Sequence, residues 1–474
     1  MGHTGMRSVT LLGGLCVGLG LAAIAQAGPD GAEDPAATLQ RVLQENAALR
    51  ERVGALEKTV SQLVTELQRR QGAAAEAPTT GDAAAAEADR AAAQERLLAD
   101  ARQRDAGIWP VWSGLDVQFY GKIKLNAAID SARTSTGNYA RWVEAQPGNP
   151  SDTQFNMTAN ETRLGLNIRG PKTESFETSG QVEVDFYGGG GTENKPNLML
   201  RHAYMKLAWP QRGLEIIAGQ TWDVISPRNP STLNYPVQWW AGNIGYRRPQ
   251  VRVTQGVALC DGVKATLSAA ATRNIGRNSG FDPGDTGEDA GMPGLQGRAA
   301  VSFPLWGERE TTVGVSSHWA REEYDTDGDD GNVDLDSWSA NLDVQMPICD
   351  WLSVQAELFG GQNLDAYLGS IGSGVDVFGN SITEVRSFGG WVAASLGPWD
   401  RWRFNVGFSG ETVNDGDVDT AGARTCNQAL FGNTIYELNE NASVGLEISH
   451  WHTGYVEQDD RDSVRVQGSF IYQW

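Results

Sequence analysis

The chain has 474 residues, with 59 acidic and 38 basic side chains, which give a formal net charge of −21. This acidic excess excludes nucleic acid as a partner, because phosphate binding needs a basic surface. No apolar run beyond the first 30 residues reaches the roughly 18 residues that a helix needs to cross a bilayer. A multi-span helical membrane protein is therefore excluded, whereas a β-rich soluble protein and a β-barrel both remain open.

The first 27 residues have the pattern of a secretory signal peptide. Arg7 supplies the positive start, residues 9–25 are apolar, and an A-x-A cleavage motif ends at Ala27. We expect the mature chain to begin near Gly28, outside the cytoplasm. Three scattered cysteines then remain, whose number and spacing indicate neither a disulfide framework nor a metal site: Cys260, Cys349 and Cys426.

Residues 38–70 carry a heptad repeat, which predicts a coiled coil and hence an oligomer. The a positions are Leu39, Asn46, Val53, Val60 and Leu67, and the d positions are Val42, Leu49, Leu56 and Leu63. Asn46 is polar, so it fixes the register at a cost in stability. Residues 71–107 are rich in Ala, Glu, Asp and Arg and predict a semi-helical spacer.

A synthetic peptide of residues 39–67 is expected to associate by itself, because Asn46 is the one polar residue among its nine a and d positions. Sedimentation equilibrium at high peptide concentration checks this expectation. A purely monomeric peptide would contradict it.

From residue 115 to the C-terminus, apolar and polar residues alternate with a period of two. Sixteen such segments centre on residues 117–129, 164–168, 182–186, 203–207, 216, 251–253, 263–267, 299–303, 313–315, 342–344, 354–358, 392–396, 402–408, 430–438, 444–448 and 464–474. An even number of strands with one apolar face is the pattern of an outer-membrane barrel. The sequence therefore predicts an all-β fold, a 16-stranded antiparallel transmembrane β-barrel over residues 115–474, preceded by the α-helical coiled coil.

The connections between these segments also favour a barrel. Short turns such as 210–213 and 397–400 alternate with long polar loops such as 273–296 and 361–383, as in barrels with short periplasmic turns. Tryptophans near strand ends fit an interfacial girdle: Trp209, Trp351, Trp399 and Trp402. A soluble β-sandwich alternates too, but its outward face would be polar.

The last strand ends in a row of aromatic residues on one face: Phe470, Tyr472 and Trp474. The alternative is an ordinary final strand. A terminal aromatic residue resembles the signal read by the barrel assembly machinery of the outer membrane, although Phe is the commoner last residue. We therefore expect these three residues to be an assembly signal and that machinery to be a partner.

Part of the chain resembles the DcaP-like porin family. The segments that carry the resemblance are FNMTANETRLGLNIRGP (155–171), SGQVEVDFYGG (179–189), NLMLRHAYMKL (197–207), AGQTWDVISPRNPSTLNY (218–235) and WWAGNIGYRRPQVRV (239–253). The resemblance implies a homotrimeric 16-stranded outer-membrane porin with a periplasmic coiled coil, which takes up small anionic solutes such as dicarboxylates. The Ala-rich spacer and the acidic external loops depart from the family.

Loop 221–243 is too rich in Pro and Trp for a solvated external loop, so we expect it to fold inward as the constriction. The alternative is a surface loop or a trimer contact. Its candidate functional residues are Asp223, Arg228, Asn229, Tyr235, Trp239 and Trp240.

Basic residues gather at the positions that strand parity turns toward the lumen. These are Lys122, Lys124, Arg163, Lys206, Arg248, Arg252, Arg298, Arg401, Arg403 and Arg465, accompanied by His202 and Tyr204. Acidic residues on the same face are Glu161, Glu183, Asp185, Glu357 and Glu447. Arg and Lys in a pore favour anions, and guanidinium groups match carboxylates. The alternative is that half of the cations only pair with lumenal carboxylates and stiffen the wall.

No resident cofactor or metal is expected. The segment with Asp325, Asp327 and Asp329 resembles a calcium loop, but its Gly is displaced and the bidentate Glu is missing. A solvated acidic loop is the favoured interpretation, and divalent cation bridging to lipid head groups is the weaker one. His450 and His452 lack a catalytic arrangement, so we expect them to be interfacial.

The function that these patterns predict is passive diffusion of small anionic solutes through a trimeric porin in a Gram-negative outer membrane. Its partners would be outer-membrane lipid, two further copies of the chain and, through the periplasmic coiled coil, the cell wall. One alternative is a structural barrel tethered to the cell wall. A barrel enzyme is the other alternative, for which five histidines in all offer little material.

Overall fold

In this computed structural model the chain divides into two units, residues 1–98 and 99–474. The residues that the structure describes are 108–112, 115–145, 152–188, 196–275, 287–288, 290–325, 332–378 and 381–474. The expected signal peptide (1–27), coiled coil (38–70) and spacer (71–107) lie outside these residues and stay predictions. Within the described part of the chain, no helix is long and apolar enough to cross a bilayer.

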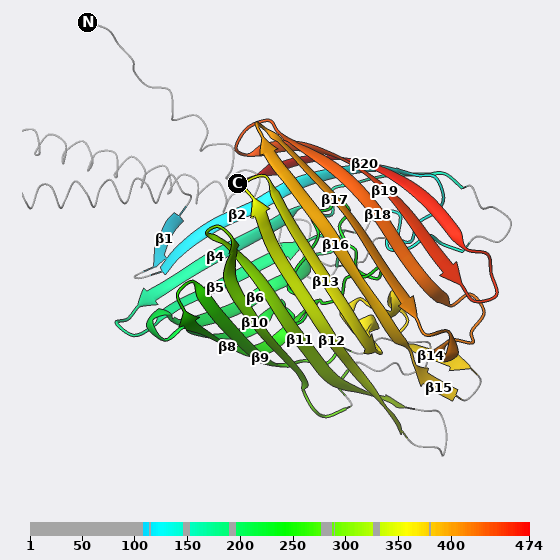
Figure 1. The fold of residues 1–474 in the computed structure, drawn as a ribbon, viewed down its shortest axis with the longest axis horizontal. Coiled ribbons are helices and arrows are strands. Elements are labelled where there is room, and N and C mark those ends of the chain that lie inside the picture. Colours follow the sequence, from blue (N-terminus) through cyan, green and yellow to red (C-terminus); the bar gives the residue numbers. More distant parts are fainter. Residues whose placement is uncertain are drawn as a thin grey trace, which may run out of the picture. The chain divides into compact units, whose positions relative to one another are not determined.

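The described strands form a closed antiparallel barrel, drawn in Figure 1. Fifteen of its wall positions are single strands: β2 (Leu115–Asp130), β5 (Glu177–Asp185), β6 (Met199–Trp209), β7 (Leu214–Trp222), β8 (Arg247–Cys260), β9 (Val263–Thr272), β10 (Gly294–Trp306), β11 (Arg309–Asp325), β12 (Asn332–Cys349), β13 (Leu352–Gln362), β16 (Arg386–Trp399), β17 (Trp402–Val413), β18 (Arg424–Glu437), β19 (Ala442–Tyr455) and β20 (Arg461–Gln473). The remaining position is divided between β3 (Gln154–Thr158) and β4 (Arg163–Lys172), which both pair with β2. The predicted 16-stranded barrel is therefore confirmed.

A few elements lie outside the wall. β1 (Ile108–Trp112) pairs with the start of β2, and β14 (Val375–Phe378) forms a hairpin with β15 (Ser381–Glu384). Four 3-10 turns complete the described elements: η2 (Pro210–Arg212), η3 (Asp365–Tyr367), η4 (Ser370–Gly372) and η5 (Asp415–Asp417).

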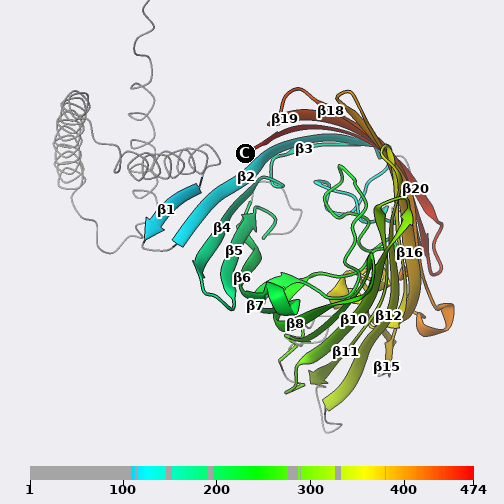
Figure 2. The same cartoon turned by 60° about the vertical axis from the view of Figure 1, so that its left-hand side comes forward.

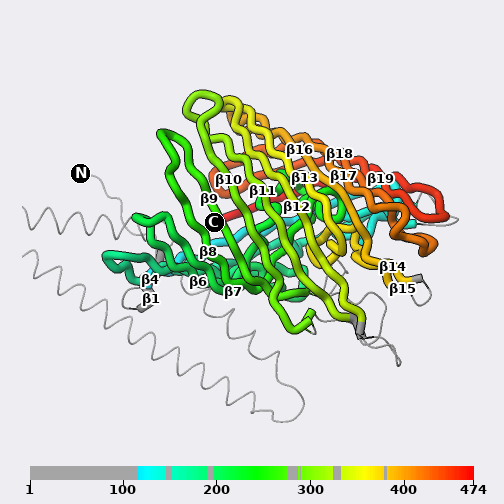
Figure 3. Tube along the Cα trace, turned by 60° about the horizontal axis from the view of Figure 1, so that its bottom comes forward, coloured from blue at the N-terminus to red at the C-terminus, as the bar shows by residue number. Residues whose placement is uncertain are grey.

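The wall has an apolar outer face and a polar inner face, as a period of two requires. On β2 the side chains of Ile123 and Ile129 are each 52% exposed, whereas Lys124 and Asp130 point inward and are buried. Figure 3 shows the strands running obliquely side by side around the barrel, the usual tilt of such walls. A band of large, exposed apolar side chains around a polar interior is the reverse of the arrangement in a soluble protein. It matches a lipid-facing surface.

The first and last wall strands close the barrel. β2 pairs with β20 from Lys122 opposite Gln473 to Asp130 opposite Arg465. Gly121 and Trp474 exchange backbone hydrogen bonds of 3.2 and 3.1 Å, and the Trp474 ring lies 5.8 Å from that of Phe119. The C-terminal residue is thus part of the seam that completes the barrel.

Replacing Trp474 with Asp is expected to impair insertion into the outer membrane. The carboxylate would face the apolar surface at the seam, where the cost to the folded barrel is only about 0–1 kcal/mol near the interface, so most of the effect falls on recognition during assembly. The amount of heat-modifiable barrel in outer-membrane fractions measures it. Wild-type amounts in the Trp474→Asp variant would refute the assembly signal.

Three long connections at one end of the barrel fold into its lumen, as the green segment between β7 and β8 shows in Figure 2. Their inward parts are residues 131–145, 223–246 and 363–374. Ala140 and Val143 of the first pack with Trp451 of the wall, and Ile225 and Ile244 of the second pack with Leu364 and Tyr367 of the third. The lumen therefore contains a packed core of its own at this level.

Candidate functional site: the pore constriction

Residues 223–246, here named the belt, cross the lumen between β7 and β8. The backbone N–H of Arg228 donates to Glu357 Oε1 on β13 (2.7 Å), and the N–H of Leu233 donates to Glu447 Oε2 on β19 (2.6 Å). Lys124 of β2 donates to the carbonyl oxygen of Leu233 (2.9 Å). The belt thus lies inside the barrel, where loop 221–243 was expected.

The belt holds an unusual backbone conformation. Ser226, Val237, Gln238 and Trp240 all have positive φ, between 47° and 69°, and for a β-branched residue such as Val237 this is a genuine outlier. Each such residue costs of order 1–3 kcal/mol and persists only where its surroundings enforce it. The hydrogen bonds to the wall hold these residues in their positive-φ conformations. The belt therefore keeps its shape through the inner wall and not through its own backbone preferences.

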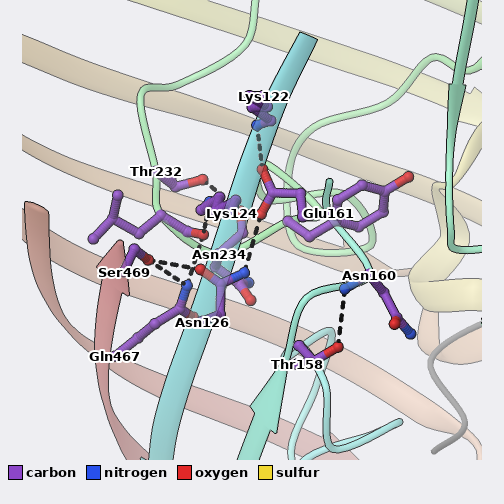
Figure 4. A network of polar contacts seen from close by, with 12 residues as sticks. Lys122, Lys124, Asn126, Thr158, Asn160, Glu161, Thr232, Asn234, Gln467 and Ser469 are labelled. Atoms are coloured by element: carbon purple, nitrogen blue, oxygen red, sulfur yellow. Dashed lines mark hydrogen bonds and ion pairs between the residues drawn. The ribbon is translucent and has the colours of Figure 1, made fainter. Parts of the chain in front are cut away.

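A break in the wall between β3 and β4 directs Glu161 into the lumen, as Figure 4 shows. Its Oε1 accepts from Lys122 Nζ (2.7 Å), and its Oε2 accepts from Lys124 Nζ (2.6 Å) and Asn126 Nδ2 (3.2 Å). One carboxylate therefore binds two of the predicted pore lysines. Glu161 reduces the positive charge that this side of the lumen presents to a solute.

A β-bulge brings in a cation that sequence parity missed. Glu183 pairs with His202 and Val184 with Leu200, so Arg201 is the extra residue and both it and His202 turn inward. Arg201 donates to Glu183 Oε1 (2.6 Å) and Asp185 Oδ2 (2.8 Å). The sequence offered one signal for an inward Arg201, the free energy of its alternative position. Simple alternation would put this arginine on the lipid face at a cost of about 2–4 kcal/mol near the midplane, which a bulge avoids.

Arg163 and Arg252 are two predicted pore cations that keep unused hydrogen-bond donors. Arg163 is half-buried and its side chain makes no hydrogen bond with any described residue, although Glu161, Glu183 and Arg201 act on it electrostatically. Arg252 makes one long bond, from Nη1 to the carbonyl oxygen of Trp222 (3.4 Å), and lies in the field of Tyr204. Both guanidinium groups can thus bind a passing anion.

Arg248 differs most from its expected position. Its side chain is fully buried, forms an ion pair with Asp223 (2.7 Å between Nε and Oδ1), donates from Nη2 to the carbonyl oxygen of Ala366 (3.0 Å), and stacks on the Tyr367 ring (3.8 Å). The segments that fold into the lumen cover it, which parity on one strand could not reveal. Arg248 therefore joins the belt to segment 363–374 and does not face the open lumen.

Other predicted cations are paired with acids. Arg298 forms two hydrogen bonds with Asp343 (2.9 and 2.7 Å), and Arg465 binds Asp130 (2.7 Å) beneath the loops. Lys206 Nζ lies 3.5 Å from Glu215 Oε1.

The remaining predicted residues lie at a turn or on β6. Arg401 and Arg403 lie at a short turn, where Arg401 donates to the Leu438 carbonyl oxygen and Arg403 pairs with Glu437. His202 is buried beside Thr221 (3.1 Å), and Tyr204 is half-buried near Arg252.

The predicted belt residues take different parts in holding the belt. Arg228 reaches Asp343 (3.5 Å) and Gln345, and Asn229 accepts from Asn243 Nδ2 (3.2 Å). The Tyr235 hydroxyl donates to Asp185 Oδ2 (3.0 Å). Trp239 and Trp240 are buried in an aromatic cluster with Trp142.

The candidate metal loop lies outside what the structure describes, because Asp327 and Asp329 and the side chain of Asp325 are not among those residues. The described side chains contain no group of three or more His, Cys, Asp or Glu arranged to hold a metal ion. In the external loops, the Arg386 guanidinium donates to both carboxylate oxygens of Asp417 (2.8 and 2.6 Å) and lowers the pKa of that acid.

Comparison with known proteins agrees with this geometry. Residues 108–265 match the model of the DcaP outer membrane protein family, which confirms the resemblance seen in the sequence. The outer membrane channel DcaP of Acinetobacter baumannii has a similar structure, with 19% identity and a TM-score of 0.62 over 76% of this chain and 98% of that one. An anion-selective porin from Comamonas acidovorans is also similar, with 11% identity and a TM-score of 0.50 over 76% of this chain and 100% of that one. No curated protein sequence matches the chain significantly.

Proposed function

We propose, from the premise that residues 108–265 of this chain carry the DcaP outer membrane protein pattern, that it is a passive diffusion channel for small anionic solutes such as dicarboxylates. The family match and the porin fold indicate an outer-membrane channel and not an enzyme. The belt is the constriction, and three copies form the functional assembly in the outer membrane.

The observation that carries the anion selectivity is the difference in pairing between three inner-wall acids and two inner-wall cations. Glu161, Glu183 and Asp185 are each bound by a lysine or arginine, whereas Arg163 and Arg252 keep unused donors. A carboxylate that passes them exchanges part of its hydration for charge-assisted hydrogen bonds. The same two charges raise the barrier for cations.

Planar-bilayer recording of the full-length protein tests this proposal. We expect stepwise currents in groups of three, and a reversal potential in a tenfold KCl gradient that shows preference for chloride. Cation preference would overturn the anion selectivity. A barrel that inserts but carries no current would instead support the structural alternative, in which the predicted coiled coil at 38–70 tethers the barrel to the cell wall.

A further inference from the structure

The belt and the two neighbouring inward-folded segments enclose an aromatic chamber, a cavity of about 310 Å³. The aromatic residues that line it are Tyr139, Tyr187, Tyr235, Trp239, Trp240 and Tyr246. Their rings contact one another, for example Tyr187 with Tyr235 at 4.2 Å and Trp239 with Tyr246 at 6.2 Å between centroids. The chamber is therefore a single structured space, and its lining does not include Arg163 or Arg252.

Several hydrogen-bond donors of this chamber have no acceptor. Tyr187 Oη, Trp239 Nε1 and Trp240 Nε1 are buried without a hydrogen-bond partner anywhere in the described chain. An unpaired buried donor costs free energy, and native proteins contain few of them. Three such donors on rings that line one chamber therefore point to a ligand that supplies acceptors.

Arg247 does not line the chamber itself, but it places an unpaired positive charge against two of the lining rings, Trp239 and Tyr246. Its side chain is 2% exposed, and both Nη1 and Nη2 are buried without an acceptor among the described residues. Its guanidinium stacks on the rings of Trp222, Tyr246 and Trp239, at 4.6, 5.2 and 5.7 Å from their centroids. Stacking on ring faces leaves the edge of the guanidinium free to bind a carboxylate.

The nearby carboxylates already have other partners. Asp185 accepts from Arg201 and from the Tyr235 hydroxyl. Asp223 forms an ion pair with Arg248 and accepts from Gln296 Nε2 (2.8 Å) and from the backbone N–H of Tyr246 (2.8 Å). Donors therefore exceed acceptors around the chamber, and an anion is the complementary ligand.

We propose that the aromatic chamber is a binding site for a monocarboxylate with an apolar body, whose carboxylate binds Arg247 and the orphan donors while its body lies against the rings. One unpaired cation matches one negative charge. The two charged residues that line the chamber, Arg141 and Asp365, have opposite signs, and Arg141 already stacks on Trp142 (4.1 Å). The second carboxylate of a dicarboxylate would lie among aromatic rings, where an unpaired charge is costly.

This inference rests on the proposed channel function and adds a saturable site within it. Hexanoate and adipate are matched six-carbon probes with one and two carboxylates. Isothermal titration calorimetry of the full-length protein in detergent measures their binding, and block of the chloride current in planar bilayers measures their effect on the channel.

The informative variant is Tyr187→Phe combined with Trp239→Phe, which keeps an aromatic ring at each position and removes two orphan donors. We expect hexanoate affinity and block to weaken about tenfold, the scale on which lost hydrogen bonds to a charged group act, while the action of adipate stays unchanged. Arg247→Lys, which keeps the charge but loses the planar edge, should also weaken hexanoate binding.

Trp338→Phe is the matched control, because this tryptophan is 42% exposed on the outer face; it should leave both probes unaffected. Equal hexanoate affinity in the wild type and the double variant would overturn the chamber site while leaving the channel function standing. Failure of the wild type to conduct would overturn the channel function instead, and the calorimetric comparison would still decide the site.

Discussion

Replacing Glu357 and Glu447 together with Ala is expected to raise the single-channel conductance several-fold by releasing the belt from the wall. Glu357 holds the belt at Arg228, and Glu447 holds it at Leu233 and at the backbone N–H of Asn234 (3.2 Å). Both carboxylates are almost completely buried. Their removal leaves backbone donors unpaired at about 1–3 kcal/mol each.

The belt is expected to change conformation once these hydrogen bonds are lost, because its positive-φ residues already store strain. The sixteen wall strands keep their own ladders, so the barrel itself should persist, as its heat-modifiable mobility will report. Glu437→Ala is the matched control: this glutamate is partly exposed at a short turn and pairs with Arg403. Unchanged conductance in the double variant would mean that the belt is held by its apolar contacts alone.

The sequence was sufficient to predict the wall and only part of the site. Alternation such as that of Ile123 and Lys124 depends on one strand and on which face meets lipid, so strand number and parity could be derived locally. Arg201 was missed because a bulge moves one residue across the wall, and nothing in the pattern of β6 alone marks the bulge. The free-energy cost of placing Arg201 on the lipid face was the one available clue.

Arg248 shows a second limit of sequence reasoning. Its parity was assigned correctly, but its exposure depends on Tyr367 and Ala366, which are more than 100 residues away in the chain and fold over it from another loop. Arg298 and Arg465 likewise pair with acids of other strands or of the seam. Which cations stay unpaired is a property of the three-dimensional arrangement, so the selectivity site could only be narrowed from sequence to a set of candidates.

Ion selectivity is expected to move in opposite directions when the unpaired arginines and the lysine-binding glutamate are changed. Arg163→Ser with Arg252→Ser removes two cations that no described acid binds directly, so the pore should lose preference for chloride. Glu161→Gln instead frees Lys122 and Lys124 from the carboxylate that they share. That variant should increase the preference for chloride, which a simple loss of structure would not do.

The size of the shift follows from Coulomb's law in a water-filled lumen. A unit charge at contact distance contributes about 1 kcal/mol in water, which corresponds to about a fivefold change in relative permeability per charge. Arg248 is left unchanged, because its loss would break the buried pair with Asp223 and confuse folding with selectivity. Arg403→Ser, at the short turn beside Glu437, serves as the control for removing an arginine outside the constriction.

Reversal potentials in a tenfold KCl gradient measure both variants, and salt concentration provides an internal check. The screening length is about 8 Å near physiological ionic strength and about 3 Å at 1 M. Through-space effects of Arg163 and Arg252 should therefore be largest in dilute salt and shrink as both solutions are concentrated. If the arginine variant and Glu161→Gln shift the reversal potential in the same direction, charge at these positions does not set selectivity. In that case the width of the opening that the belt leaves in the lumen would have to set the selectivity.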